Sequence, residues 1–236
     1  METKKMKRMA IAGLIGGLQF AIGDLLVYLS PNYHNGSAIY TDWANMNMWR
    51  LALSFYLGCL GTGLLLIGFY SLYSITKQTC SDRFRHFLAV PAYGAVLTSI
   101  GHFFIACVVP MTYKGAISAG ASDEMAKVIA SSWELYINPL KVFIMLAVIL
   151  VQSIMMIGLI LKGKINCPKW MVLLNPVAFI IISIPISILL NGTGLEGITE
   201  AFESLGEGCM YLAVYYHWSR LEITHNRKLD YCHSIK

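Results

Sequence analysis

Long runs of apolar residues, each about the length of a membrane crossing, dominate the pattern along this chain. Six such runs are separated by more polar segments, at residues 9–29, 51–73, 88–110, 138–161, 171–190 and 199–218. About 20 helical residues, each rising roughly 1.5 Å, match a hydrocarbon layer of about 30 Å. An open sheet in lipid would leave its edge groups unpaired, and the alternating pattern of a membrane barrel is missing. The runs therefore predict membrane-spanning helices.

The expected fold is all-α: one integral membrane domain over residues 1–236, built as a polytopic six-transmembrane-helix bundle. An outer amphipathic helix is also predicted between the third and fourth spans, over residues 122–136. Ser122 suits its N-cap. One face of this segment carries four apolar residues: Met125, Val128, Ile129 and Trp133. We expect it to lie along the outer surface until Pro139 redirects the chain into the fourth span.

The basic residues predict the orientation of the bundle. Of 18 Lys and Arg residues, four fall on one predicted side: Arg50, Lys114, Lys127 and Lys141. The other 14 lie in the N-terminal tail, in the 74–87 and 162–170 loops, and in the tail at 219–236. Short cytoplasmic loops of membrane proteins are enriched in Lys and Arg, so both ends are predicted to be cytoplasmic, in the plasma (cell) membrane.

Composition agrees with this interpretation. The chain is 56% hydrophobic and 13% charged, whereas soluble domains carry about 25% charged residues. Its net charge of +5 follows from the placement of the loops, so no nucleic-acid partner is needed to explain it. The bilayer is the one partner that the pattern identifies, and protein partners stay undetermined. Six cysteines are expected to be free thiols, since half lie in apolar runs and half in segments assigned to the reducing cytoplasm.

Two glycine patterns invite an interpretation. Gly192, Gly194 and Gly197 spell G-x-G-x-x-G, but the dinucleotide motif needs a strand before it and a helix after it. A membrane helix precedes this one, so a tight loop is the better explanation, and no cofactor is predicted. Small residues also repeat along the first span, and the second span carries glycines at Gly58, Gly61 and Gly68. These faces predict close helix packing inside the bundle.

Polar residues within the spans gather toward the outer side. The candidate ligand-binding residues are Asp24, His102, Asn138, Lys141, Glu203 and Glu207. At about 1.5 Å per residue, Asp24, Lys141 and Glu203 lie roughly 5–8 Å below the outer helix ends, and His102 and Glu207 about 12 Å. A charge near the membrane centre costs roughly 2.5–3.5 kcal/mol, so such groups normally face a partner or a cavity. We infer an outward-opening polar pocket with His102 and Glu207 near its floor.

A purely structural explanation competes with this pocket. Long side chains within about one helical turn of a span's end can extend to the headgroups. Asp24 can form an ion pair with Arg50 or Lys141, and a lone histidine is more often a hydrogen-bonded packing residue than a ligand. This explanation accounts for the rim of the outer side better than for His102 and Glu207, which lie deeper.

Three functions remain open from the sequence. The first is binding or transport of a small cationic or zwitterionic molecule through the outward-facing pocket. The second is a membrane-embedded enzyme acting on a lipid or isoprenoid substrate, with His102 and Glu207 as acid and base; its metal version adds Asp24 and Glu203 as ligands. The third is a structural, assembly or sensory subunit. No catalytic residue is assigned, no metal site is predicted, and the first function is preferred because acidic groups outnumber basic ones around the proposed mouth.

Overall fold

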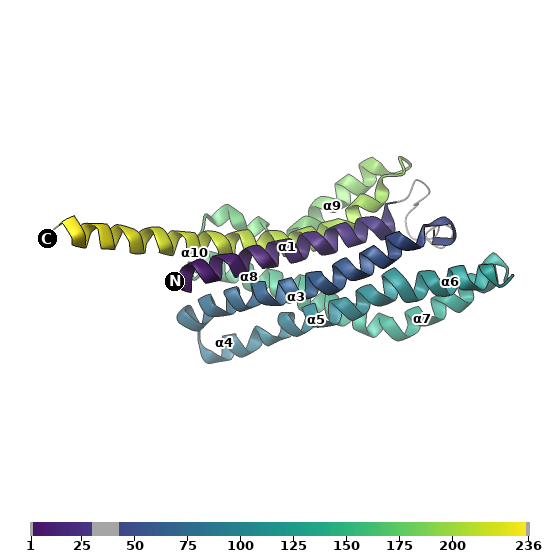
Figure 1. Ribbon diagram of the computed structural model, residues 1–236, viewed down its shortest axis with the longest axis horizontal. Helices are drawn as coiled ribbons and strands as arrows, with labels where there is room; N and C mark the ends of the chain where they lie inside the picture. The colour runs from purple at the N-terminus through teal and green to yellow at the C-terminus, as the bar shows by residue number, and fades with distance from the viewer. Residues whose placement is uncertain (1, 30–42, 235–236) are drawn as a thin grey trace.

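The computed structural model describes residues 2–29 and 43–234, and this part of the chain is helical without strands (Figure 1). Its long helices run back and forth along one axis. Their bounds are α1 Glu2–Tyr28, α3 Met48–Thr79, α4 Asp82–Phe87, α5 Ala89–Phe103, α6 Val109–Ser118, α7 Asp123–Ile144, α8 Gln152–Leu161, α9 Pro176–Leu190 and α10 Phe202–Ser234. Four shorter segments interrupt or join them: η1 Phe104–Val108, η2 Met145–Val151, η3 Lys169–Leu173 and η4 Glu196–Ala201.

Four of the described helical segments are long and apolar enough to cross a membrane: Glu2–Tyr28, Met48–Thr79, Asp82–Ser118 and Asp123–Leu161. The helical membrane architecture predicted from the sequence is confirmed at this level. The fifth apolar helix, α9, has only 15 residues, and α10 falls outside the set because polar side chains such as Glu203, Glu207 and His217 interrupt its apolar run. The structure therefore supports four crossings by length and composition.

Glycines let α1 pack closely between α3 and α10, which lie beside it (Figure 1). A Cβ atom at Gly16 would lie 2.7 Å from the carbonyl oxygen of Gly61, and one at Gly17 would collide with the backbone of Gly208. The predicted contact between the first two spans is confirmed. The contact between α1 and α10 was not foreseen, because the glycines of α10, Gly206 and Gly208, do not repeat at four-residue spacing.

The third and fourth spans continue well past the membrane length as one helical hairpin. α5, η1 and α6 form one arm and α7, η2 and α8 the other, and α6 packs against α7. Ser122 caps α7 as expected, since its Oγ accepts a hydrogen bond from the backbone N–H of Met125 at 3.2 Å. However, α7 runs through Pro139 without a break, so a separate outer amphipathic helix is not confirmed. One missing N–H does not end a helix whose neighbouring turns are intact.

The fifth predicted span is divided. The range 171–190 was expected to be one helix, but its start belongs to the 3₁₀ segment η3, and α9 begins only at Pro176. Asn175, which precedes the proline, has an extended backbone (φ −154°, ψ 160°), as the residue before a proline prefers. Its side chain accepts a hydrogen bond from the N–H of Ala178 at 3.1 Å and so caps α9.

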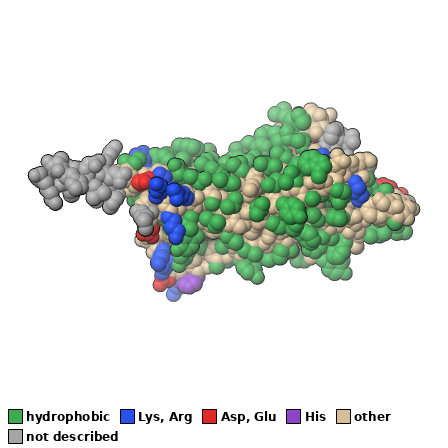
Figure 2. Space-filling view, in the orientation of Figure 1, with side chains coloured by type: hydrophobic (Ala, Val, Ile, Leu, Met, Phe, Trp, Pro, Cys, Tyr) green, Lys and Arg blue, Asp and Glu red, His purple; other side chains and the backbone are tan. Residues whose placement is uncertain are grey.

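The two ends of the bundle differ in charge. Figure 2 shows most of the visible Lys and Arg side chains gathered at the end where the N-terminus and α4 lie. α10 returns to this same end, so the start of α1 and the end of α10 lie together (Figure 1). There the Nζ of Lys7 lies 2.6 Å from Glu222 Oε2, and this hydrogen bond holds the pKa of the Glu222 carboxyl below its usual value. The basic residues thus mark one end of the molecule.

Candidate binding site

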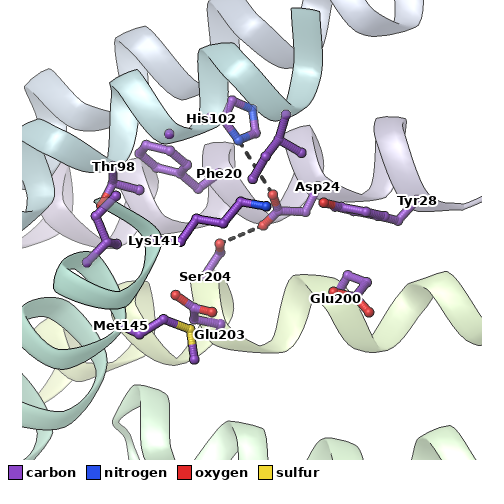
Figure 3. A pocket seen from close by; sticks show the side chains of 13 residues that line it. Phe20, Asp24, Tyr28, Thr98, His102, Lys141, Met145, Glu200, Glu203 and Ser204 are labelled. Carbon is purple, nitrogen blue, oxygen red and sulfur yellow. Dashed lines mark hydrogen bonds and ion pairs between the residues drawn. The ribbon is translucent and has the colours of Figure 1, made fainter. Parts of the chain in front are cut away.

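A cavity of about 270 Å³ lies among α1, α5, α7 and α10, near the end of α1 and the start of α10 (Figure 3). We call it the carboxylate cavity because three carboxyl groups line it, those of Asp24, Glu200 and Glu203. Its other lining residues are Phe20, Tyr28, Thr98, Gly101, His102, Ile105, Lys141, Ile144, Met145 and Ser204. Four of the six residues predicted from the sequence therefore meet at one cavity.

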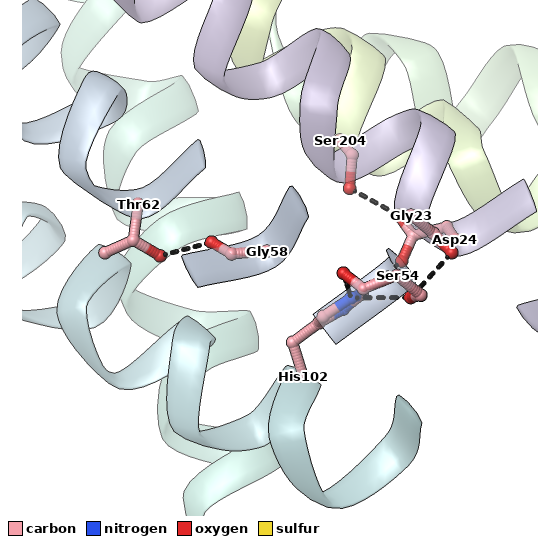
Figure 4. Close-up of polar contacts among 7 residues, drawn as sticks. All are labelled: Gly23, Asp24, Ser54, Gly58, Thr62, His102 and Ser204. Carbon is pink, nitrogen blue, oxygen red and sulfur yellow. Dashed lines mark hydrogen bonds and ion pairs between the residues drawn. The ribbon is translucent and has the colours of Figure 1, made fainter. Parts of the chain in front are cut away.

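Asp24 lies between two polar partners from other helices (Figures 3 and 4). Its Oδ2 accepts a hydrogen bond from the hydroxyl of Ser204 on α10 at 2.6 Å. Its Oδ1 lies 3.7 Å from Nδ1 of His102 on α5. The Asp24 side chain is 16% exposed and that of His102 is 7% exposed, so the pair lies in the wall of the cavity, largely away from the surface. A single aspartate thus connects three helices.

The hydrogen bonds of Ser54 determine which nitrogen of His102 carries a proton (Figure 4). The Ser54 hydroxyl donates its only hydrogen to the carbonyl of Gly23 at 2.8 Å. His102 Nε2 lies 2.9 Å from that hydroxyl oxygen and 3.0 Å from the Ser54 carbonyl, so both oxygens must accept from it. Nε2 therefore bears hydrogen. The other ring nitrogen, Nδ1, faces the Asp24 carboxylate. These two groups attract each other only when either Nδ1 or the carboxylate carries a proton.

Glycines and an aromatic ring fix the position of the His102 side chain. A Cβ at Gly58 would collide with the imidazole, and one at Gly23 would lie 3.2 Å from Nε2. The ring of Phe20 meets the imidazole edge-on, with centroids 5.5 Å apart. Helices α1 and α3 therefore leave a space that fits this imidazole and little else.

The charges around the cavity do not balance. The side chain of Lys141 reaches across it toward Asp24, and Glu200 and Glu203 lie on the side of α10 (Figure 3). Both glutamates act electrostatically on Asp24. Among the described lining residues, three carboxyl groups meet one ammonium group, that of Lys141. Like charges this close repel in a low-dielectric site, and a bound cation would relieve that repulsion.

Two predicted residues lie outside the cavity. Glu207 is one helical turn beyond Glu203 on α10, is only 4% exposed, and does not line the cavity. Its carboxyl group lies next to the Gln152 side chain, and its Oε1 has no hydrogen-bond partner among the described residues. Asn138 is exposed although it lies one turn before Lys141. The structure thus brings Asp24, His102, Lys141 and Glu203 together and leaves Glu207 and Asn138 apart.

Comparison with known proteins relates most of the chain to one protein family. The model of a family of unknown function, DUF6796, matches residues 1–220. The chain belongs to the DUF6796 family. No curated protein and no solved structure matches it. The match covers every residue that lines the carboxylate cavity, so the site lies within the part shared with the family.

Sequence reasoning missed several parts of this DUF6796 site. Ser54 and Ser204 are uncharged and stood out in no pattern, although each holds one member of the Asp24–His102 pair. The two π-helical segments were also missed: η1 contributes Ile105 and η2 contributes Met145 to the cavity lining. Such π-bulges are frequent at functional sites, but no simple sequence pattern identifies them.

Within residues 2–29 and 43–234, no group of three or more His, Cys, Asp or Glu side chains is placed to hold a metal ion. The metal version of the enzyme hypothesis required His102 and Glu207 in one ligand set, and only His102 lines the cavity.

Proposed function

We propose that the protein binds a small organic cation, of the ammonium type, in the carboxylate cavity as part of a binding or transport function. The observation that supports this proposal is the meeting of Asp24, Glu200 and Glu203 around a space of about 270 Å³, where Lys141 is the one Lys or Arg side chain among the described lining residues. Anionic side chains in a confined apolar setting attract cations strongly because water screens them less.

Lys141 limits which cations fit. Its ammonium group occupies the side of the cavity near Asp24 (Figure 3), so a ligand cation is expected to approach Glu200 and Glu203 on α10. The aromatic side chains of Phe20 and Tyr28 complete the wall, and aromatic faces favour quaternary ammonium groups. A zwitterion fits only if its anionic group reaches Lys141.

The same proposal includes six membrane crossings. α10 packs along α1, with Gly17 against Gly208 and Gly13 against the ring of Tyr211, so α10 shares the membrane depth of α1. α9 packs on α10. Counting α9 and α10 as the fifth and sixth crossings makes successive crossings run in opposite directions through the membrane. The proposal places the protein in the plasma membrane with its basic end in the cytoplasm. Both termini are then cytoplasmic, and the carboxylate cavity lies in the outer half of the membrane.

The enzyme alternative receives less support from the geometry. Acid–base catalysis by His102 and Glu207 needs both groups within reach of one substrate. Only His102 lines the carboxylate cavity, and its Nε2 is engaged by Ser54. An assembly role is supported by no described feature in particular.

Calorimetric titration tests the proposal directly. The purified protein is placed in nanodiscs of a galactolipid, which carries no ammonium group, and titrated with choline and with 3,3-dimethylbutan-1-ol, its uncharged analogue. Choline is expected to bind and the alcohol is not. Glu203→Gln should weaken choline binding at least about tenfold, because the quaternary ammonium interacts with the carboxylate by charge alone, and two unit charges about 4 Å apart attract by about 4 kcal/mol at an effective dielectric constant of about 20. Glu207→Gln should weaken it less, since Glu207 lies outside the cavity.

Glu124→Gln serves as the matched control. Glu124 is exposed near the start of α7 and does not line the cavity, so its substitution should leave choline affinity unchanged. Thermal unfolding of each variant separates lost binding from lost folding. Equal affinity for choline and its uncharged analogue, or equal weakening by Glu203→Gln and Glu124→Gln, would contradict the proposal.

A further inference from the structure

A second cavity adjoins the carboxylate cavity on the side of α9. Its volume is about 490 Å³, and it shares Met145, Glu200 and Glu203 with the carboxylate cavity. We call it the α9 groove. Its remaining lining residues come from α9 and η4: Ile180, Ser183, Ile184, Ser187, Ile188 and Thr199. Glu200 and Glu203 therefore stand at the boundary where the two spaces meet.

The α9 groove opens on the apolar flank of the bundle. α9 stands somewhat apart from the other helices (Figure 1), and Pro176 is its one buried residue in the described structure. Ile184 and Ile188, which line the groove, are 56% and 71% exposed. In a membrane these side chains face the acyl chains of lipids. A molecule dissolved in the bilayer can therefore reach the groove from the side.

Three lining residues of the groove carry hydroxyl groups, Ser183, Ser187 and Thr199, and two of these groups donate within the helices. The Ser183 hydroxyl donates to the carbonyl of Ile180 at 2.8 Å, and the Thr199 hydroxyl donates to the carbonyl of Glu196 at 2.9 Å. These hydrogens are already used within the helices and are not needed by a ligand. The isoleucines of α9 and Met145 offer flexible apolar contact along the rest of the groove.

We propose that the ligand is a cationic amphiphile, whose ammonium head lies in the carboxylate cavity and whose single aliphatic tail lies in the α9 groove. This inference rests on the proposed function and specifies the class of ligand. In the described lining, the acidic side chains of Asp24 and Glu203 lie in the same cavity as Lys141, and this acidic excess favours a head with net positive charge. The phosphate of a zwitterionic phospholipid would lie beside Glu200 or Glu203 and be repelled, so a bilayer phospholipid is a poorer occupant.

Photolabelling in galactolipid nanodiscs tests where the tail lies. The probe is decyltrimethylammonium with a diazirine on its tail, and the matched probe carries a sulfate head on the same chain. The cationic probe is expected to label α9 within residues 180–188, and excess choline should abolish that labelling. Ile184→Trp, which fills the groove, should cause loss of labelling while choline affinity stays unchanged. Ile182→Trp, on an exposed position that does not line the groove, should preserve both.

The outcomes separate this inference from the proposed function. Equal labelling by the cationic and sulfate probes would show an ordinary lipid contact and overturn the amphiphile proposal. Labelling that choline does not displace would overturn it as well. If choline binds normally in either case, the proposed cation site stands without the tail groove. If choline itself does not bind, the proposed function fails together with the inference.

Discussion

His102 shows how single residues determine the shape of the carboxylate cavity. Its imidazole is oriented by two oxygens of Ser54 and enclosed by Gly58, Gly23 and the ring of Phe20. The nitrogen that remains, Nδ1, faces Asp24 at 3.7 Å. Because one edge of the imidazole is held by Ser54, a displacement of the ring changes the position of Nδ1 relative to Asp24. Small changes behind the imidazole should therefore reach the cavity.

Gly58→Ala tests that dependence. The new methyl group would collide with the imidazole of His102, which has backbone on its other side and little room to move. Overpacking of this kind costs about 1–3 kcal/mol, so we expect a lower unfolding temperature and weaker choline binding. Gly63→Ala on the same helix is the control, because no atom lies within 4 Å of its added Cβ. Similar losses in both variants would mean that helix α3 tolerates no substitution, regardless of His102.

Residue spacing and depth identified part of the site and misjudged another part. Asp24, His102, Lys141 and Glu203 were found because a charge inside an apolar run is expensive and needs a reason. Asn138 was included because it shares a helical face with Lys141, yet only the longer lysine side chain reaches the cavity. The direction in which a face points depends on the packing of neighbouring helices. Residue spacing alone does not predict which way a helix face points.

At the scale of elements, the apolar runs predicted where helices lie better than where they end. Hydrophobicity locates the middle of a span, because lipid contact demands it over about 20 residues. It does not stop a helix in water, and α6 and α7 continue together beyond the membrane length since they pack on each other. Inside the fifth span, local chemistry decided the helix start: Pro176 and its capping residue Asn175 placed it later than the apolar run began.

Asn175→Ala should therefore destabilise α9 selectively. The buried Asn175 side chain accepts from the N–H of Ala178 and donates to the carbonyl of Val172, so alanine leaves both backbone groups unpaired. Loss of an N-cap costs about 0.5–2 kcal/mol. Hydrogen exchange followed by mass spectrometry should show faster exchange in residues 176–180, while α3 exchanges as before. Asn191→Ala, at the exposed other end of α9, is the control. Unchanged exchange near Ala178 would count against the capping role.

At the scale of the whole molecule, the division of charge and the packing of α1 point to the same arrangement. α1 is enclosed by α3 and α10 through close glycine contacts, which fixes the start of α1 and the end of α10 at one end of the bundle. That end holds most of the visible Lys and Arg side chains, and the carboxylate cavity lies toward the other. Under the proposed orientation, with the basic end in the cytoplasm, the carboxylate cavity lies in the outer half of the membrane.

Thiol labelling in intact cells tests this orientation. Ser118 is exposed at the tip of the α6–α7 hairpin, and Ser81 is exposed at the basic end of the bundle. Ser118→Cys should add a site that a membrane-impermeant maleimide modifies from outside, whereas Ser81→Cys should react only after the membrane is permeabilised. The unsubstituted protein measures any background from its own cysteines, including Cys80 beside Ser81. If Ser81→Cys labels from outside and Ser118→Cys does not, the bundle is inverted. The carboxylate cavity would then open toward the cytoplasm, and its ligand would be an intracellular cation.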